Sequence, residues 1–351
     1  MPSARRLAEG VRHPFEPPAE GEAVEVADGV LWMRLPLPMA LDHVDVYAFD
    51  EGDGWALVDT GFDTGRTRAI WERLLNGPLG GRPVTRLLLT HHHPDHLGLA
   101  GWFAARGAEV LTSRTAWLMG RMLTLDVQDA PPPETLRFWR RAGMIPVIYE
   151  ERKAARPWNF ADVVHPIPLG FTRLEEGDAL SFGGRVWTVR LGGGHAPDHV
   201  TLWSDDIVVG GDQLLSGISP NLGTYPTEPE ADPVADWIAT CRRLAPHAAE
   251  GQLVLAGHKR PFRGLPVRLR QLEENHHAAL ARLEGWLAEP RSAAECFPPL
   301  FRRSIGLEEY GLALVEAVAH CVHLWKAGRA ARTLRGEAWV YRATEVGEAA
   351  A

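Results

Sequence analysis

The sequence predicts an α/β fold, a layered sandwich built from two similar strand-rich halves, with a smaller helical domain after it. Three observations lead to this prediction. Short apolar or β-branched segments alternate with segments of helical spacing in both halves. A helical insert, interrupted by three consecutive prolines, separates the two halves. From about residue 264 onward, long helical runs replace the strands.

The size and composition of the chain are those of an ordinary globular protein. It has 351 residues, of which 45% are hydrophobic and 23% are charged, which suits one large domain or one large and one small domain. The net charge of −8 argues against a nucleic-acid-binding surface as the main activity. Three widely spaced cysteines (Cys241, Cys296 and Cys321) indicate reduced thiols. We see no secretory signal and no segment long enough to span a membrane, so we expect a cytoplasmic protein.

The first half opens with residues 1–22, which are rich in Pro, Glu and Ala and are predicted to form a flexible arm. Strands are then predicted by apolar and β-branched runs at Val30–Leu35, Val44–Phe49, Trp55–Val58 and Val84–Thr90. Helical spacing predicts helices at Thr67–Leu75 and Leu97–Arg106.

The insert covers residues 113–156, where helical patterning on both sides of Pro131-Pro132-Pro133 predicts two helices with a proline break. Strands return after it, at Ala179–Phe182, Val186–Leu191, Val200–Ser204, Ile207–Gly210 and Leu253–Ala256. The two strand-rich halves together are predicted to form one domain over residues 23–265.

Residues 266–351 are predicted to form a separate C-terminal domain. Helical runs at Arg268–Ala288 and Glu308–Trp325 precede a strand-like segment at Trp339–Tyr341. Helices followed by a short hairpin indicate a small winged-helix-like domain.

A cluster of potential metal ligands follows directly on the predicted strand that ends at Thr90. It has the form His91-x-His93-x-Asp95-His96. At a strand end, residues two apart point the same way, so His91 and His93 can share one ion. Pro94 forces a turn, which lets Asp95 and His96 project toward a neighbouring position. Imidazole and carboxylate are ligands that zinc takes when no thiolate is offered.

These four ligands are too few for two ions, and three further candidates also follow predicted strands. His195 comes after Gly192-Gly193-Gly194, Asp212 after Gly211, and His258 after Gly257. A glycine before each ligand allows the backbone to approach an ion closely.

These features resemble the metallo-β-lactamase superfamily, in particular the hydrolase branch that includes hydroxyacylglutathione hydrolases, lactonases and metal-dependent thioesterases. The resemblance covers roughly residues 23–265. It rests on five motifs in the family's order: Val58-Asp59-Thr60-Gly61, the HxHxDH run, Gly194-His195-Ala196-Pro197-Asp198-His199, Gly211-Asp212 and Gly257-His258. It implies a four-layer αββα sandwich, and a fold in which the 113–156 insert lies over the metal face.

The resemblance also implies an assignment for each ligand. The first metal is held by His91, His93 and His195, the second by Asp95, His96 and His258, and Asp212 bridges both. Asp59 is implied to orient the ligands and a loop without binding a metal itself. The sequence departs from the family pattern at Asp198, where glycine is usual, and at Lys259 after the last histidine. Both departures bear on substrate fit, because neither removes a ligand.

The implied cofactor is a pair of Zn²⁺ ions, with manganese or iron as alternatives. Two divalent ions lower the pKa of a shared water enough to hold hydroxide at neutral pH, and one ion stabilises the developing oxyanion. Asp95 is the candidate catalytic group that orients the nucleophile or handles its proton. Related di-iron oxidoreductases carry a glutamate where this chain has His93, which favours zinc and hydrolysis.

Several other residues lie near these motifs in the sequence or are candidates for the substrate pocket. His92 points away from its neighbours and is expected to pack in the core, whereas His199 is expected to support the site. Tyr225, Lys259 and Arg260 are candidates for the substrate pocket, the last two for an anionic group of the substrate.

Hydrolysis of a small ester-like carbonyl substrate is therefore the leading hypothesis, with thioesters ahead of lactones. The C-terminal segment does not look like the basic helical tail that holds glutathione in typical hydroxyacylglutathione hydrolases. The alternatives are a lactonase, and an endoribonuclease of the type that carries a winged-helix-like domain, against which the net charge counts. A third, non-enzymatic alternative makes the C-terminal segment a binding or dimerisation module and the metal domain a vestige, and the intact ligand set argues against it. We expect a small-molecule substrate, no DNA or membrane partner, and leave open a homodimer.

Overall fold

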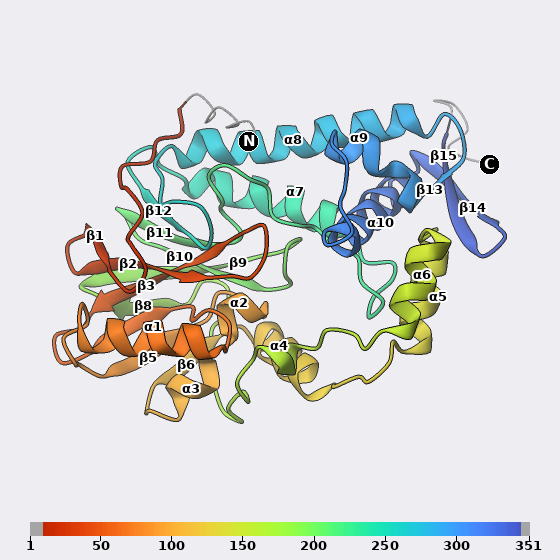
Figure 1. Ribbon diagram of the computed structural model, residues 1–351. Helices are drawn as coiled ribbons and strands as arrows, with labels where there is room; N and C mark the ends of the chain where they lie inside the picture. Colours follow the sequence, from red (N-terminus) through yellow and green to blue (C-terminus); the bar gives the residue numbers. More distant parts are fainter. Residues whose placement is uncertain (1–9, 345–351) are drawn as a thin grey trace. The chain divides into compact units, whose positions relative to one another are not determined.

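The computed structural model describes residues 10–344 and divides into two compact units (Figure 1). The first unit consists of the chain up to residue 127, residues 159–220 and residues 244–269. The second consists of residues 128–158, 221–243 and the chain from residue 270 onward. The chain therefore passes from one unit to the other five times, and neither unit is a continuous segment.

The first unit is built on two β-sheets. The larger has seven strands in the order β1-β2-β3-β4-β5-β6-β7. Their bounds are β1 Val24–Ala27, β2 Val30–Pro36, β3 His43–Asp50, β4 Trp55–Val58, β5 Val84–Leu88, β6 Glu109–Thr112 and β7 Thr172–Arg173. Neighbours from β1 to β4 are antiparallel, and those from β4 to β7 are parallel. The parallel part brings the carboxyl ends of β4 and β5 to the same sheet edge.

The second sheet of this unit has five strands in the order β12-β11-β10-β9-β8. Their bounds are β8 Ala179–Phe182, β9 Arg185–Gly192, β10 His199–Trp203, β11 Ile207–Gly211 and β12 Leu253–Ala256. Strands β11 and β12 are parallel, so their carboxyl ends also lie side by side. All nine strands predicted in the two halves are present, with small differences at their ends.

The two sheets enclose a shared core, which confirms the predicted sandwich. Phe49 of the first sheet lies against Trp187 of the second, with ring centroids 5.5 Å apart, and Phe182 stacks on the same tryptophan at 5.2 Å. Phe49 and Trp187 are completely buried. Truncating an aromatic side chain in such a core costs about 3–5 kcal/mol.

Helices cover the outer face of the seven-stranded sheet. Helix α1 (Gly65–Asn76) is capped by Thr64, whose side chain accepts a hydrogen bond from the Thr67 amide, and it buries Ile70, Trp71 and Leu74. The helix predicted at Leu97–Arg106 is interrupted and forms two short helices, α2 (Pro94–Leu97) and α3 (Ala100–Ala104). The interruption lies at Gly98, where a Cβ atom would stand 2.4 Å from the Gly61 carbonyl oxygen.

The predicted insert contains three helices, so the prediction of two was wrong. They are α4 (Arg114–Leu125), α5 (Pro133–Arg141) and α6 (Pro146–Ala154). Gly143, with φ of 75°, ends α5, and Pro146 starts α6 at the first helical position, where proline is well tolerated. Moreover, α4 belongs to the first unit and α5 and α6 to the second, so the predicted 113–156 insert is divided between both units.

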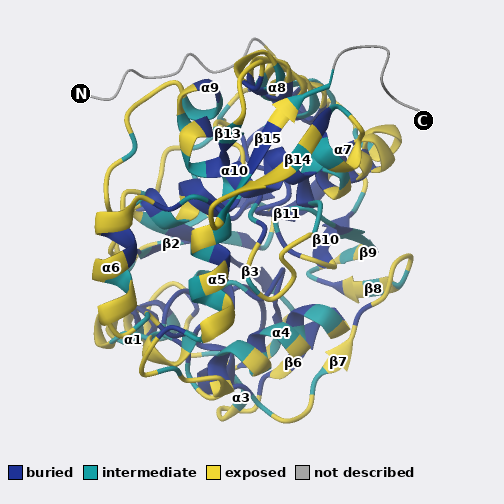
Figure 2. Ribbon diagram, turned by 90° about the vertical axis from the view of Figure 1, so that its right-hand side faces the viewer, coloured by how far each residue is buried: buried dark blue, intermediate teal, exposed yellow. Residues whose placement is uncertain are grey.

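The second unit also holds the predicted helices and hairpin of the C-terminal segment. It contains α7 (Pro233–Leu244, up to residue 243), the greater part of α8 (Leu265–Trp286), α9 (Phe297–Phe301) and α10 (Tyr310–Lys326). Strands β13 (Arg291–Ser292), β14 (Ala330–Arg335) and β15 (Ala338–Ala343) form a sheet in the order β13-β15-β14. Figure 2 shows α10 largely buried, whereas the outer strand β14 is largely exposed. The winged-helix-like character of this unit stays a prediction.

The N-terminal residues that the structure describes are not a loose arm. Arg12 pairs with Arg263 in a β-bridge, and Glu20 binds Arg66 and Arg73 on α1. Hydrogen bonds and ion pairs to the body of the first unit thus hold residues 10–22, in contrast to the predicted flexibility. The rest of the predicted arm, residues 1–9, lies outside the described residues.

Two further expectations concern the thiols and the helices. Cys241, Cys296 and Cys321 are buried thiols, and no disulfide occurs in the part of the chain from residue 10 to 344. Within that same range, no helix combines the length and the apolar character needed to cross a bilayer.

Candidate metal centre

Potential ligands gather where strands of the two sheets end. Asp59 follows β4 and His91 follows β5, and these strands are parallel neighbours. Asp212 follows β11 and His258 follows β12, which are also parallel. His195 follows β9 in the same sheet. All these strands lie in the first unit. The side chains that follow them meet at one site, where their ligand atoms lie close together.

Three histidines form the first ligand group. The Nε2 atom of His91 lies 3.0 Å from Nδ1 of His93, which lies 2.9 Å from Nε2 of His195. Ligand nitrogens about 2.0–2.1 Å from a tetrahedral zinc are roughly 3.3 Å apart. The three nitrogens therefore converge almost as closely as ligands on one ion. Strand β5 ends at Leu88, so His91 and His93 lie beyond the strand and its side-chain alternation does not bring them together. They converge because His91 presents Nε2 and His93 presents Nδ1.

Asp95, His96 and His258 form the second group. The Oδ2 atom of Asp95 lies 3.3 Å from Nε2 of His258 and 3.5 Å from Nε2 of His96. Pro94 starts the short helix α2, with His93 as its N-cap. The predicted turn at Pro94 is thus the first turn of a helix, and this turn carries Asp95 and His96 to the second group.

Asp212 lies between the two groups. Its Oδ2 atom is 3.3 Å from Nε2 of His195 and also 3.3 Å from Nε2 of His258. Its Oδ1 atom is 3.5 Å from Nε2 of His96. One carboxylate therefore faces histidines of both groups, as a bridging ligand would.

Groups behind the histidines fix which nitrogen faces the site. Nδ1 of His96 is 2.8 Å from Oδ2 of Asp59, and Nδ1 of His258 is 2.8 Å from the main-chain oxygen of His43. Both acceptors require the proton on Nδ1, which leaves Nε2 as the lone-pair nitrogen in the neutral ring. Thr90 donates to Asp59 through both its amide and its hydroxyl group, which holds that carboxylate in place.

The residues fit a pair of divalent cations. Nε2 of His96 and Oδ1 of Asp212 are buried and make no hydrogen bond among the residues that the structure describes. Burying such ligand atoms without a partner is costly, and a cation would supply the missing partner. The backbone also leaves room only for glycine at the site. A Cβ atom on Gly257 would stand 2.4 Å from Oδ1 of Asp212, and one on Gly211 would stand 2.7 Å from the ring of His199.

The two groups differ in their electrostatics. Burial, together with the neighbouring imidazoles, lowers the pKa of His91 and His93 well below the usual value. Burial alone would also lower the pKa of His96 and His258, but nearby carboxylates, above all Asp95 and Asp212, outweigh it. They raise the pKa of His96 well above its usual value and that of His258 to about 10. The second group therefore attracts positive charge.

Three turns beside the ligands adopt the left-handed conformation at a residue other than glycine. Asp59 has φ of 61° and Lys259 has φ of 77°. Non-glycine residues in this region store strain and cluster at functional sites. Asp198, where the family usually has glycine, has φ of 49°, and its carboxylate accepts a hydrogen bond from the Thr115 hydroxyl group on α4.

The predicted supporting residues differ in where they lie. His199 is buried, its Nε2 atom accepts a hydrogen bond from the amide of Asp212, and its ring stacks on His91. His92 is buried, as expected for a packing residue. Asp59 lies behind His96, where the resemblance implies it.

The three predicted substrate residues belong to different units of the chain. The amide of Lys259 binds His43. The Arg260 guanidinium binds the Phe15 carbonyl oxygen and the Glu16 carboxylate of the N-terminal segment, and its role at a substrate stays a prediction. Tyr225 belongs to the second unit, and its role at the substrate stays a prediction.

Sequence reasoning missed His43. Its main-chain oxygen orients His258, and its ring nitrogen Nε2 accepts a hydrogen bond from the Lys259 amide. The Asp45 amide and the Tyr47 hydroxyl group, on the same strand, donate to the main-chain oxygens of Gly257 and Ala256. Strand β3 thus supports the His258 loop. A contact through a main-chain oxygen leaves no signal in the sequence.

Family models match two parts of this chain. A model described as the metallo-beta-lactamase superfamily matches residues 39–129, and one described as the metallo-beta-lactamase-like C-terminal domain matches residues 280–345. The first match contains the HxHxDH run, and the second covers most of the C-terminal part of the second unit.

Known proteins are similar to the chain over most of its length or, in one case below, over about half of it. The crystal structure of a beta-lactamase domain protein from Burkholderia ambifaria is 34% identical, with a TM-score of 0.86, and the match covers 95% of this chain and 98% of that one. The probable metallo-hydrolase YqjP of Bacillus subtilis is 25% identical, over 84% of this chain and 91% of its own length. A hydroxyacylglutathione hydrolase of Xylella fastidiosa is 28% identical, over 52% of this chain and 50% of its own length.

Proposed function

Because this chain belongs to the metallo-beta-lactamase superfamily and is a metal-dependent hydrolase, we propose that it uses two zinc ions to hydrolyse an ester-like carbonyl compound, with thioesters favoured over lactones.

The position of Asp212 carries the proposal of two ions. One oxygen of this carboxylate lies 3.3 Å from a histidine of each ligand group, and the other lies 3.5 Å from His96. A site for a single ion would need only one of these groups. The first group would hold one ion through His91, His93 and His195. The second would be held by Asp95, His96 and His258, and Asp212 would belong to both.

The donor set favours zinc, because the seven candidate ligands are five imidazoles and two carboxylates. When bound, two such ions supply Lewis acidity for a carbonyl oxygen and a water of lowered pKa. The chain's own residues prepare the site for this chemistry. Asp59 and the His43 carbonyl oxygen keep Nε2 of His96 and His258 free of protons in the neutral rings. Burial keeps His91 and His93 neutral by lowering their pKa.

Asp95 is the residue of this site that we propose to handle a proton. Its Oδ2 atom faces His96 and His258, and its side chain is 16% exposed, so the carboxylate also reaches solvent. The neighbouring imidazoles outweigh the effect of burial and lower the pKa of Asp95. It is therefore ionised at neutral pH and able to accept a hydrogen bond from a water molecule.

The substrate class is inferred from the chemistry of the site and from one relative. The Xylella protein is named for the hydrolysis of hydroxyacylglutathione, a thioester. A thioester carbonyl is a good electrophile with a stable leaving group, which suits a site built to polarise a carbonyl oxygen. The net charge of −8 disfavours RNA as the alternative substrate.

A metal assay and a substrate panel test the proposal together. The zinc-loaded protein is expected to contain about two ions per chain, and Asp212→Asn is expected to lower this number. Turnover is then measured on an acyl-CoA, S-lactoylglutathione, a homoserine lactone and a single-stranded RNA. We expect turnover of a thioester first. A protein that retains only one ion, or that turns over none of the carbonyl compounds, would contradict the proposal.

A further inference from the structure

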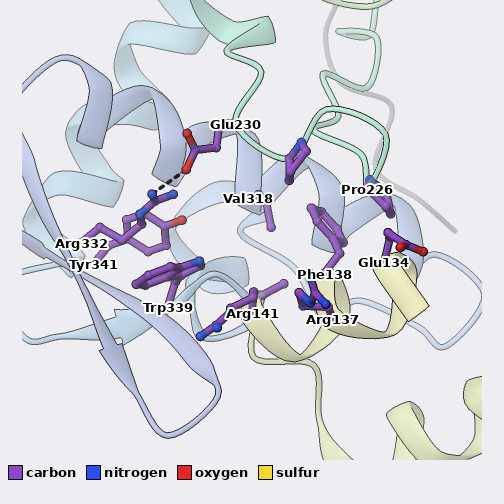
Figure 3. Close-up of a pocket in the computed structure, with 12 residues that line it drawn as sticks. Glu134, Arg137, Phe138, Arg141, Pro226, Glu230, Val318, Arg332, Trp339 and Tyr341 are labelled. Atoms are coloured by element: carbon purple, nitrogen blue, oxygen red, sulfur yellow. Dashed lines mark hydrogen bonds and ion pairs between the residues drawn. The ribbon is translucent and has the colours of Figure 1, made fainter. Parts of the chain in front are cut away.

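A cavity lies within the second unit, and no candidate metal ligand lines it. Its volume is about 250 Å³, and it is lined by residues of α5, the β14–β15 hairpin, α10 and the loop at residues 226–230 (Figure 3). Every residue that lines it belongs to the second unit, whereas the seven candidate metal ligands all belong to the first.

Helix α5 contributes one continuous face to this cavity. Glu134, Arg137, Phe138 and Arg141 line it, at spacings of three, four and seven residues from the first. These positions lie above one another on a helix. Phe138 is buried, whereas Arg137 is exposed. The face thus combines an apolar ring with two guanidinium groups.

The hairpin contributes an aromatic face. Trp339 and Tyr341 are two residues apart on β15, so their side chains share one side of the sheet, and Arg332 lies directly opposite Tyr341 on β14. The Arg332 guanidinium forms a 2.7 Å ion pair with Glu230, drawn as a dashed line in Figure 3, and lies 4.6 Å from the Trp339 ring centroid. Its charge is therefore already neutralised.

The two arginines of α5 that line this cavity, Arg137 and Arg141, are not neutralised in this way. Among the residues that the structure describes, neither Arg137 nor Arg141 forms an ion pair with a carboxylate. Arg141 donates to the main-chain oxygen of Glu337 and stacks 4.9 Å from the Trp339 ring centroid. By contrast, Arg140 on the same helix binds the Glu337 carboxylate at 3.0 Å and the Tyr149 hydroxyl group at 2.7 Å.

An adjoining cavity is lined by all three arginines of α5. It has a volume of about 300 Å³ and shares Arg137 and Arg141 with the first. Arg137 and Arg141 therefore line both cavities, whereas Arg140 lines only the adjoining one. Arginine without a carboxylate partner is well suited to a phosphate or carboxylate, which it binds through paired hydrogen bonds.

We propose that this cavity is a binding site for a small organic anion with a flat apolar body and a phosphate or carboxylate group. The body lies between Phe138 and Trp339, and the anionic group binds Arg137 and Arg141. Cavities that are mainly apolar, with a few charged groups, are typical ligand sites. Glu134 is the carboxylate of the lining without an ion pair among the described residues, and it opposes anion binding.

The experiment measures ligand binding to the full-length, zinc-loaded protein by calorimetry. The probes are 2-naphthylphosphonate and 2-naphthoate, which separate the two anionic groups, with inorganic phosphate and 2-naphthalenemethanol as the anion alone and the ring alone. We expect at least one naphthyl anion to bind at least tenfold more tightly than either fragment.

Charge variants then assign the binding to this cavity. Arg137→Gln combined with Arg141→Gln is expected to weaken binding at least tenfold. The matched control Arg140→Gln, on the same helix, is expected to leave it unchanged. Glu134→Gln is expected to tighten it severalfold, a change that misfolding cannot produce. Hydrolysis by the metal centre is a separate readout, which these four substitutions are expected to leave unaltered.

Three results would overturn the proposal. The first is no binding of either naphthyl anion at millimolar concentration. The second is equal binding of 2-naphthalenemethanol, which would make the cavity a purely apolar one. The third is binding that the paired arginine substitutions do not change in a protein whose unfolding temperature is also unchanged, which would place the probe outside this cavity. None of these results depends on whether the protein hydrolyses a thioester.

Discussion

Asp59 and His96 form a buried carboxylate–imidazole pair, with Oδ2 of Asp59 2.8 Å from Nδ1 of His96. The same carboxylate receives two hydrogen bonds from Thr90, so its orientation is fixed from the side of the neighbouring strand. The pair determines that Nε2 of His96 faces the site, and a metal ion needs the lone pair of this nitrogen.

Asp59→Asn is expected to weaken zinc binding at the second ligand group by about 10- to 100-fold. An amide can donate to Nδ1 of His96, which would move the imidazole proton to Nε2, the atom that faces Asp95 and Asp212. Competition with a chromogenic chelator measures the affinity. Asp63→Asn is the matched control, because Asp63 pairs with Arg68 near the start of α1. Equal loss of affinity in both variants would argue against an orienting role.

Zinc binding is expected to release protons from the second ligand group and not from His91 or His93. In the metal-free protein, His258 (pKa about 10) and His96 (pKa raised well above its usual value) are protonated at pH 7. The pKa of His91 and His93 is lowered, so both are already neutral. Metal binding requires neutral imidazoles, so affinity for the second ion should rise with pH up to about 10.

Calorimetric titrations in buffers of different ionisation enthalpy measure this release. At pH 7 we expect about two protons to be released when the second ion binds. The affinity for this ion should therefore change by roughly 100-fold per pH unit. His258→Ala should remove about one of these protons. Uptake of both ions without a buffer-dependent heat would show that the carboxylates do not hold these histidines in the charged form.

Gly257→Ala is expected to reduce the zinc content to one ion per chain or fewer. The added methyl group would stand 2.4 Å from Oδ1 of Asp212 and 2.8 Å from the ring of His96, so at least one of these ligands must move. Overpacking of this kind costs about 1–3 kcal/mol. Elemental analysis after dialysis gives the metal content. Gly251→Ala, where a Cβ atom would meet nothing within 4 Å, should retain the metal of the unaltered protein.

Asp198→Gly is expected to change the Michaelis constant for the substrate while leaving the metal content unaltered. Glycine adopts the φ of 49° at this position without strain, so the backbone is preserved. What is lost is the hydrogen bond from Thr115, which connects helix α4 to the loop that carries His195. Thr115→Val removes the same bond from the other side and should give a similar change. Steady-state kinetics on the best substrate of the panel, with metal analysis alongside, checks this prediction.

The fold and the ligand cluster could be predicted from the sequence because both depend on local signals. Strands such as Trp55–Val58 and Leu253–Ala256 are short apolar runs with turn residues behind them, and their predicted bounds agree with the structure. The histidines and aspartates of the cluster follow these strands, so a correct strand prediction also places them near one edge.

The parts that failed depend on the tertiary structure. His43 supports His258 through a main-chain oxygen, which any residue could supply. The contacts of Arg260, which follows His258 closely, could not be foreseen. The left-handed turn at Lys259 redirects the chain, and the guanidinium pairs with the N-terminal segment. The division of the insert between two units could not be predicted either, because both parts have the same helical pattern.

The alternation of the chain between two compact units constrains how the molecule can be made and dissected. The second unit needs residues 128–158, 221–243 and the stretch from residue 270 onward. During synthesis, the first two of these segments leave the ribosome long before their partners. Their apolar faces therefore stay exposed to solvent until the rest of the unit is made, unless another protein covers them. A protein shortened after residue 269 would keep both segments without the helices and hairpin that complete their unit. We therefore expect the isolated N-terminal portion to aggregate, and a graft of the metal centre into another scaffold to require all three pieces of the first unit.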